Sequence, residues 1–199
     1  MFTGLIEAVG RVMDVQRTAS GLRVRIGTTL ASELALGDSL AVNGVCLTVV
    51  IAADDYVVCD VGPETARVTT LGALQAGELL NLERPIRADG RFGGHFVQGH
   101  IDATGRVTRL REDGEAHWLT VAFTADLAPY LILKGSIAVD GISLTVAALA
   151  EDRFDVMIVP YTWEQTNVRS RRVGDTVNLE CDLIGKYLVR AAAAMARAE

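Results

Sequence analysis

Hydrophobic and polar positions alternate along short stretches of the chain, a pattern typical of β-strands with one buried face. These stretches are residues 22–26, 45–51, 56–61, 79–84, 118–123, 153–159 and 176–180. Asn43-Gly44 and Asp140-Gly141 each precede an apolar run, and both dipeptides favour the tight turn of a β-hairpin. Short helices are expected at 32–34 and 125–131. The pattern predicts an all-β protein.

The same unit occurs twice in the chain. Identical residues occupy six of nine positions between 4–12 and 99–107, seven of thirteen between 37–49 and 134–146, and seven of twenty-two between 62–83 and 159–180. A unit of this length can bury its own core, and about six short strands suit a small closed barrel without exposed edges. We predict one barrel over 1–94 and a second over 95–182, joined through the glycine-rich segment 83–100.

The last segment, 183–199, has a different pattern. Its apolar residues recur at helical spacing, at Ile184, Tyr187, Leu188, Ala191, Ala192 and Met195. We predict an amphipathic helix over 183–198. Its apolar face could pack on its own barrel or against another copy of the chain, and the spacing alone favours neither.

Composition narrows the function classes. The net charge is −6 and the isoelectric point is near 5.1, so a nucleic-acid or membrane-surface binder is disfavoured. No apolar stretch is long enough to span a membrane, and the first residues lack the pattern of a secretory signal. Cys46, Cys59 and Cys181 are odd in number and lack metal or disulfide spacing. We expect a soluble cytoplasmic protein with free thiols.

Differences between the matched repeats mark candidate chemistry. Leu5 becomes His100, Gly37 becomes Lys134, Asn43 becomes Asp140, and Cys46 becomes Ser143. Two pockets of similar shape but different polar groups would suit a protein that binds two similar molecules and treats them differently. We state this as a hypothesis based on the repeat.

Simpler interpretations stay open for each candidate. His100 either acts as an acid or base or only hydrogen-bonds a loop carbonyl, and Cys46 is either a nucleophile or a small apolar residue. Ser143 lacks the GxSxG turn of hydrolases, and Thr48 and Thr145 also suit strands without a ligand. The cysteines and histidines lack zinc-ligand spacing, and no nucleotide-binding glycine motif occurs.

Several motifs together resemble one family. They are MFTGLIE, NGVCLTV, PET, TTLG, NLER, GGHFVQGHID, KGSIAVDGISLTV and NLECDLIGKYL, in this order along nearly the whole chain. They resemble the riboflavin synthase family of alpha-chain type, which is built from lumazine-binding repeats. Ala66, Gln98, Tyr161 and Trp163 depart from the family pattern, which puts the local pocket shape in doubt.

The resemblance implies a fold and a reaction. The fold would be two tandem six-stranded Greek-key barrels with a carboxy-terminal helix that joins three subunits. Two molecules of 6,7-dimethyl-8-ribityllumazine would exchange a four-carbon unit and give riboflavin and 5-amino-6-ribitylaminouracil, without a metal or organic cofactor. The site would lie between the first barrel of one subunit and the second barrel of a neighbour.

The resemblance also carries site residues onto this chain. For the first barrel these are Gly4, Leu5, Ile6, Cys46, Leu47, Thr48, Asp60, Val61, Gly62, Pro63, Glu64 and Thr65. For the second barrel they are Gly99, His100, Ile101, Lys134, Ser143, Leu144, Thr145, Met157, Ile158, Val159, Pro160, Tyr161 and Thr162. Positions implicated in catalysis or its support are Ser39, Cys46, His100, Asp140, Ser143, Thr145 and Asp182.

The expected mechanism relies mainly on holding two rings face to face. His100, with Ser143 and Thr145 nearby, would take or relay the proton of the acidic C7 methyl group. A hydroxyl, a water or the Cys46 thiolate would add at C7 of the other molecule. The alternative function is a non-catalytic lumazine or flavin carrier of the same fold. A pure assembly module would leave the paired polar differences unexplained.

Overall fold

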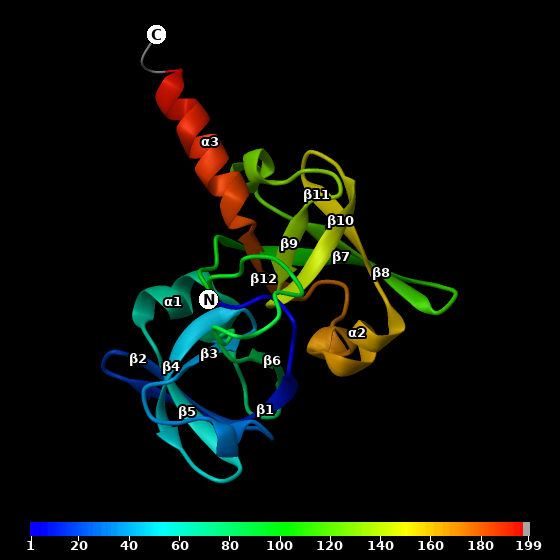
Figure 1. Ribbon diagram of the computed structural model, residues 1–199. Coiled ribbons are helices and arrows are strands. Elements are labelled where there is room, and N and C mark those ends of the chain that lie inside the picture. Colours follow the sequence, from blue (N-terminus) through cyan, green and yellow to red (C-terminus); the bar gives the residue numbers. More distant parts are fainter. Residues whose placement is uncertain (197–199) are drawn as a thin grey trace.

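The computed structural model describes residues 1–196 and contains two closed six-stranded barrels (Figure 1). The first barrel comprises β1 (Ala8–Thr18), β2 (Gly21–Gly27), β3 (Ser39–Val42), β4 (Val45–Ala52), β5 (Tyr56–Val61) and β6 (Leu79–Glu83). The second comprises β7 (Ala103–Asp113), β8 (Ala116–Ala122), β9 (Ser136–Val139), β10 (Ile142–Leu149), β11 (Arg153–Ile158) and β12 (Thr176–Cys181). The tandem barrels predicted from the repeat are confirmed.

Both barrels have the same strand order, and all their pairs are antiparallel. In the first barrel the order is β1-β2-β5-β4-β3-β6, and β6 pairs with β1 to close the sheet. The β3–β4 hairpin turns at Asn43-Gly44, with φ of 46° and 78°, and β9–β10 turns at Asp140-Gly141, with φ of 45° and 81°. These left-handed conformations are the ones expected of such dipeptides. The two predicted hairpins are therefore present.

Alternating side chains fill each barrel. On β2, Leu22, Val24 and Ile26 face the first core, while Arg23 and Arg25 point outward. The second barrel has its own apolar cluster. A third, small cluster lies between the barrels and consists of Phe2, Ala41, Val97 and Ala138. Each repeat thus buries its own core, as the length of the unit predicts.

The helices are short except for the last one. They are the 3₁₀ helices η1 (Ala31–Glu33), η2 (Thr70–Ala73), η3 (Ala125–Tyr130) and η4 (Asn167–Ser170), and the α-helices α1 (Pro63–Val68), α2 (Pro160–Gln165) and α3 (Leu183–Met195). The expected helices at 32–34 and 125–131 are present as η1 and η3. Sequence periodicity did not predict α1 and α2, because each has only six residues, too few for a repeating apolar face.

The barrels meet at their equivalent hairpin turns. Gly44 and Gly141 lie so close that a Cβ on Gly44 would be 2.7 Å from the amide nitrogen of Gly141. Asn81 Nδ2 donates to the carbonyl of Asp140 at 2.9 Å, and Asn178 Nδ2 donates to the carbonyl of Asn43 at 2.9 Å. These reciprocal bonds relate the two halves by an approximate twofold axis.

Helix α3 extends away from both barrels (Figure 1). Asp182 caps its first turn by accepting a hydrogen bond from the Ile184 amide at 3.0 Å. Tyr187 and Leu188 are 70% and 65% exposed, so the apolar face is not covered by the chain's own barrels. The last residues of the predicted helix, 197 and 198, lie outside the described residues. No helix in the described part of the chain is long and apolar enough to cross a membrane.

Candidate active site

The amino-terminal segment lies against the second barrel. The Ser143 amide on β10 donates to the Gly4 carbonyl at 2.8 Å, and Ile6 packs on the core of the second barrel. Only after this crossing does the chain enter the first barrel at β1. The expectation that Gly4, Leu5 and Ile6 serve the first barrel is therefore wrong.

The matching segment of the second repeat crosses in the opposite direction. The Cys46 amide on β4 donates to the Gly99 carbonyl at 2.9 Å, and Ile101 packs on the first core. The expectation that Gly99, His100 and Ile101 serve the second barrel is also wrong. Each barrel is therefore contacted by the segment that leads into the other barrel, and we take these two crossings as the candidate pockets.

Two glycines make these crossings possible. Gly4 and Gly99 have φ of +79° and +84°, in the left-handed region. A Cβ on Gly4 would lie 2.6 Å from the Ser143 Cβ, and a Cβ on Gly99 would lie 2.4 Å from the Cys46 Cβ. Any larger residue would push the segment off its pocket.

Two buried carboxylates hold the crossing segments in place. Glu83 accepts from the amides of Thr3 at 2.7 Å and Gly4 at 2.9 Å. Glu180 accepts from the amides of Gln98, Gly99 and His100 at 2.7, 2.9 and 3.2 Å. Burial raises the pKa of both carboxyl groups, and these backbone hydrogen bonds oppose that rise. Sequence reasoning did not assign these residues, although both end the matched NLE motif.

The strands that receive the crossing segments, β4 and β10, alternate between residues that face the barrel core and residues that point outward. Cys46 and Thr48 point out of the first barrel, and Ser143 and Thr145 point out of the second. Ser39 pairs with Thr48 across the β3–β4 hairpin. Residues of the predicted set that point into the barrel cores are Leu47, Val61, Leu144 and Ile158. Their side chains are therefore unavailable to a ligand, which leaves only their backbone groups.

The remaining predicted segments lead from β5 into α1 and from β11 into α2. In the first barrel, two of these residues form ion pairs: Asp60 with Arg23 at 2.7 Å, and Glu64 with Arg67 at 2.6 Å. Gly62 and Pro63 are exposed, and Thr65 is half-buried. In the second, Met157, Val159, Pro160 and Tyr161 are exposed and Thr162 is half-buried. Tyr161 is 75% exposed on the single chain.

Two side chains distinguish the second repeat from the first. Lys134 has φ of +65°, a conformation for which the first repeat uses Gly37. A lysine in this conformation costs about 1 kcal/mol more in backbone strain than a glycine. Trp163, which matches Ala66, stacks on His117 with ring centroids 3.7 Å apart.

The histidines do not lie where the sequence suggested. His100 is exposed and follows Gly99 on the Cys46 side, so within one chain it lies beside the first barrel and not on the Ser143 side. Ser143 Oγ instead lies 2.7 Å from Nδ1 of His95. Burial lowers the pKa of His95, and the nearby Asp182 carboxylate opposes this effect. His95 was considered from sequence only as a poor zinc ligand.

Two predicted catalytic carboxylates have structural surroundings. Asp140 is 2% exposed, accepts from the Asn178 amide at 2.8 Å and pairs with Arg171 at 2.6 Å. It belongs to the inter-barrel network rather than to a pocket. Asp182 caps α3, as described above, and its carboxylate acts on the Ser143 side by raising the pKa of His95.

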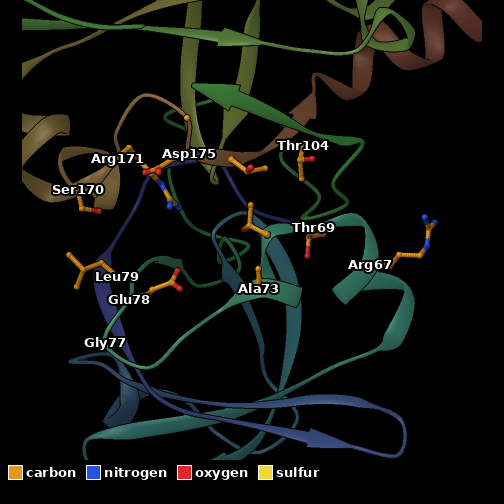
Figure 2. Close-up of a pocket in the computed structure, with 13 residues that line it drawn as sticks. Arg67, Thr69, Ala73, Gly77, Glu78, Leu79, Thr104, Ser170, Arg171 and Asp175 are labelled. Atoms are coloured by element: carbon orange, nitrogen blue, oxygen red, sulfur yellow. The ribbon is translucent and has the colours of Figure 1, made fainter. Parts of the chain in front are cut away.

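A groove of about 730 Å³ lies elsewhere, at the junction of the barrels (Figure 2). Thr69, Leu79, Arg171 and Asp175 are among its lining residues, and none of the predicted site residues lines it. The volume of this groove would favour it as a binding site, but the close glycine contacts and the buried carboxylates lie at the two crossing segments instead. We place the candidate site at the crossing segments because two of the repeat differences, Leu5/His100 and Cys46/Ser143, lie there.

The described residues offer no metal cluster, and their cysteines are free thiols. Residues 1–196 hold no cluster of three or more His, Cys, Asp or Glu side chains arranged for a metal ion. All three cysteines are free. Burial raises the pKa of the Cys59 and Cys181 thiols to about 12, so both stay protonated, whereas Cys46 is only half-buried beside a pocket.

Comparison with known proteins defines the class first. The profile of the lumazine binding domain family matches residues 3–85 and 98–182, so both barrels are lumazine-binding repeats. A solved structure of LumP complexed with riboflavin, 22% identical, superposes with a TM-score of 0.85 over 91% of this chain and 99% of that one. LumP complexed with 6,7-dimethyl-8-(1'-D-ribityl) lumazine gives a TM-score of 0.83 at 22% identity, with the same coverage. These likenesses show the fold.

Sequence relatives then define the family. Riboflavin synthase of Bacillus amyloliquefaciens is 43% identical over 96% of this chain and 89% of its own length. Riboflavin synthase of Mycobacterium tuberculosis (strain ATCC 25618 / H37Rv) is 44% identical over 96% of this chain and 97% of its own length. The chain belongs to the riboflavin synthase family and is an enzyme of the transferase class.

Proposed function

We propose that this chain converts two molecules of 6,7-dimethyl-8-ribityllumazine into riboflavin and 5-amino-6-ribitylaminouracil. The observation that carries the proposal is the pair of crossed pockets, similar in backbone and different in polar groups. One pocket offers Cys46 and His100, and the other offers Ser143 and Lys134. A reaction in which one molecule gives a four-carbon unit to an identical molecule needs such a pair of similar but unequal pockets.

The chemistry requires few catalytic groups. The C7 methyl group is acidic because its carbanion delocalises into the electron-poor ring, so an exposed histidine such as His100 suffices to accept or relay the proton. The Cys46 thiol, a hydroxyl or a water adds reversibly at C7 of the other molecule. Four carbons leave one molecule and join the other, and the reaction needs no external oxidant. Fixing both rings in a near-attack arrangement supplies several kcal/mol.

The two rings must stack on each other, and we propose that they do so between subunits. The two candidate pockets of one chain are on different barrels, and each is open, since His100 is exposed at the first and Leu5 is 49% exposed at the second. A neighbour's complementary pocket would cover these side chains. The uncovered apolar face of α3 supports a homotrimer assembled through this helix. The three free cysteines suit a reducing, cytoplasmic compartment.

Turnover tests the activity directly. Purified protein is mixed with 6,7-dimethyl-8-ribityllumazine alone, and riboflavin is followed by absorbance and fluorescence. Formation of riboflavin and the pyrimidine in equal amounts supports the proposal. Tight binding without turnover would identify a carrier instead.

Assembly is tested separately at α3. Leu188→Glu places a charge on the exposed apolar face, whereas Arg190→Glu changes charge at an exposed position outside the apolar set. Light scattering should give a trimer for the wild type and Arg190→Glu, and a monomer with little turnover for Leu188→Glu. A wild type that is monomeric at micromolar concentration would contradict the intersubunit site.

A further inference from the structure

The base of helix α3 is tied to the crossing segment that carries His100. Lys186, in the first turn of α3, has its Nζ atom 2.7 Å from Oδ2 of Asp102, and the same oxygen accepts a hydrogen bond from the Cys181 amide at 2.8 Å. The Lys186 and Asp102 side chains are 22% and 25% exposed, so salt screens their attraction less than that of a surface pair. Asp102 follows His100 by two residues, and Cys181 ends the strand that leads into α3.

The crossing segment is held on both sides of His100. Glu180 accepts from the amides of Gln98, Gly99 and His100, which fixes the chain up to the histidine. Asp102 then fixes the chain after the histidine, through Cys181 and Lys186. His100 is thus an exposed side chain on a backbone that two carboxylates hold in place.

The charge of Lys186 also acts on Glu180. Burial raises the pKa of the Glu180 carboxyl group, and so does the nearby Asp102 carboxylate, whereas the backbone hydrogen bonds and the Lys186 ammonium lower it. An ionised carboxylate is a stronger acceptor for backbone amides than a protonated one. A cation on α3 therefore supports both carboxylates that hold the segment.

The first repeat has the same carboxylate with a different cation. Glu7 matches Asp102 and accepts from the Arg84 amide at 2.6 Å, as Asp102 does from the Cys181 amide. The cation there is Arg84 itself, whose guanidinium pairs with Glu7 at 2.6 Å. Arg84 matches Cys181, so the strand of the second repeat carries no cation at this position. Its place is taken by Lys186 of α3, and no helix follows the first barrel before β7 begins.

The first turn of α3 joins this tie to the surface expected to assemble the subunits. Asp182 caps the turn, and Gly185 lies against η3, where a Cβ on Gly185 would be 3.3 Å from the Tyr130 carbonyl oxygen. Tyr187 and Leu188, which follow Lys186 directly, belong to the uncovered apolar face. Lys186 therefore lies between that face and the segment that carries the proposed base.

We propose that Lys186 is a positioning residue that fixes the His100 segment to the base of α3, so that the helix which joins the subunits also orients the proton acceptor. This inference rests on the proposed function, from which the role of His100 is taken. Lys186 acts through Asp102 and not on the substrate. Its loss leaves the Glu180 hydrogen bonds and the bond from Cys46 to Gly99 in place, so binding persists while His100 is less well oriented. A displacement of about 1 Å at a reacting group can cost far more than the small free energy of such a tie.

Four variants of the full chain test this role. Lys186→Met removes the cation, Lys186→Arg keeps it, and Lys186→Met combined with Asp102→Asn removes both charges of the pair. Arg190→Met removes an exposed cation from the next turn of α3 and is the matched control. Each variant is measured for kcat with 6,7-dimethyl-8-ribityllumazine, riboflavin affinity by flavin fluorescence, mass by light scattering, and unfolding in denaturant.

Lys186→Met should lower kcat roughly tenfold, with riboflavin affinity within roughly threefold of the wild type and an unchanged mass. Lys186→Arg should recover most of kcat, and Arg190→Met should behave as the wild type. In the double variant the free energy of unfolding should return towards the wild-type value, because no charge is left unpaired, while kcat should stay low.

Several results would overturn the proposal. An unchanged kcat in Lys186→Met, or an equal loss in Lys186→Arg, would show that the charge does not orient His100. Recovery of kcat together with stability in the double variant would leave Lys186 a purely structural role. A smaller mass in Lys186→Met would mean that the residue acts on assembly instead.

Hydrogen exchange of the backbone separates this proposal from the proposed function. In Lys186→Met the amides of residues 98–102 should exchange roughly two- to fivefold faster, and those of residues 3–7 at the wild-type rate. Arg84→Met, which removes the matching cation of the first repeat, should show the reverse. A wild type that forms no riboflavin would refute the activity and leave this comparison valid. Unchanged exchange at 98–102 would refute the role of Lys186 even where turnover is normal.

Discussion

Adding one methyl group to either crossing glycine should disable one pocket and spare the other. Gly4→Ala forces a non-glycine residue into φ of +79° and brings its Cβ to 2.6 Å from the Ser143 Cβ. Gly99→Ala does the same at φ of +84° against Cys46, at 2.4 Å. Because the first repeat contributes Gly4 to the second pocket, the affected pocket is the opposite of the one that sequence position suggests.

The magnitude follows from two costs. A left-handed alanine costs about 1–2 kcal/mol, and moving the segment breaks a backbone hydrogen bond worth about 1 kcal/mol. The sum of about 2–3 kcal/mol predicts a loss of affinity in the damaged pocket of roughly 30- to 150-fold. Gly114→Ala, at φ of +61° with no atom within 4 Å of its Cβ, should cost stability from strain without changing affinity.

Riboflavin titration followed by flavin fluorescence separates the two pockets. Ser143→Ala and Cys46→Ala mark which binding class belongs to the second and the first barrel. Gly4→Ala should weaken the same class as Ser143→Ala, and Gly99→Ala the same class as Cys46→Ala. If Gly4→Ala weakened the class marked by Cys46→Ala, the crossed assignment would be refuted.

Three further predictions concern single residues. His100→Ala should lower turnover by at least roughly tenfold with little change in riboflavin affinity, and a loss within roughly threefold would remove His100 as the base. Arg171→Leu leaves the buried Asp140 carboxylate without its partner and should lower the free energy of unfolding, measured in denaturant, by about 3–5 kcal/mol. Adding Asp140→Asn recreates the Asn43 and Leu74 combination of the first repeat and should recover most of that loss. A double variant that stays as unstable as Arg171→Leu would argue against the Asp140–Arg171 ion pair as the cause. Burial holds the pKa of His95 below its ordinary value of 6.5, so near and below pH 6.5 the unfolded chain binds more protons than the folded one, and stability falls as the pH drops. His95→Asn should therefore flatten the fall in Tm between about pH 7.5 and 5.5. An unchanged slope of Tm against pH would contradict this.

The fold was largely predictable because its signals are local. Alternating residues and the Asn43-Gly44 turn specify strands and hairpins over a few positions, and the duplication tests each signal twice. The missed helices α1 and α2 are one or two turns long and are held by their place between strand and 3₁₀ helix. Such short elements have no periodicity to detect.

The candidate site was predictable by residue but not by arrangement. The match of 4–12 with 99–107 is equally good whether each segment lies on its own barrel or on the other one. Only tertiary packing decides on which barrel each segment lies: Ile6 packs on the second core and Ile101 on the first. The partnership of His95 with Ser143 joins residues 48 positions apart and has no counterpart in the repeat comparison.

Mixed oligomers test the central claim most directly, because the proposed site takes one pocket from each of two subunits. Gly4→Ala damages the second pocket and Gly99→Ala the first, so each variant alone should convert 6,7-dimethyl-8-ribityllumazine slowly. When the two are co-expressed and purified as one assembly, intact pockets of different subunits can meet, and turnover should rise well above that of either variant. Riboflavin formation no greater than the sum of the separate variants would contradict an active site shared between subunits.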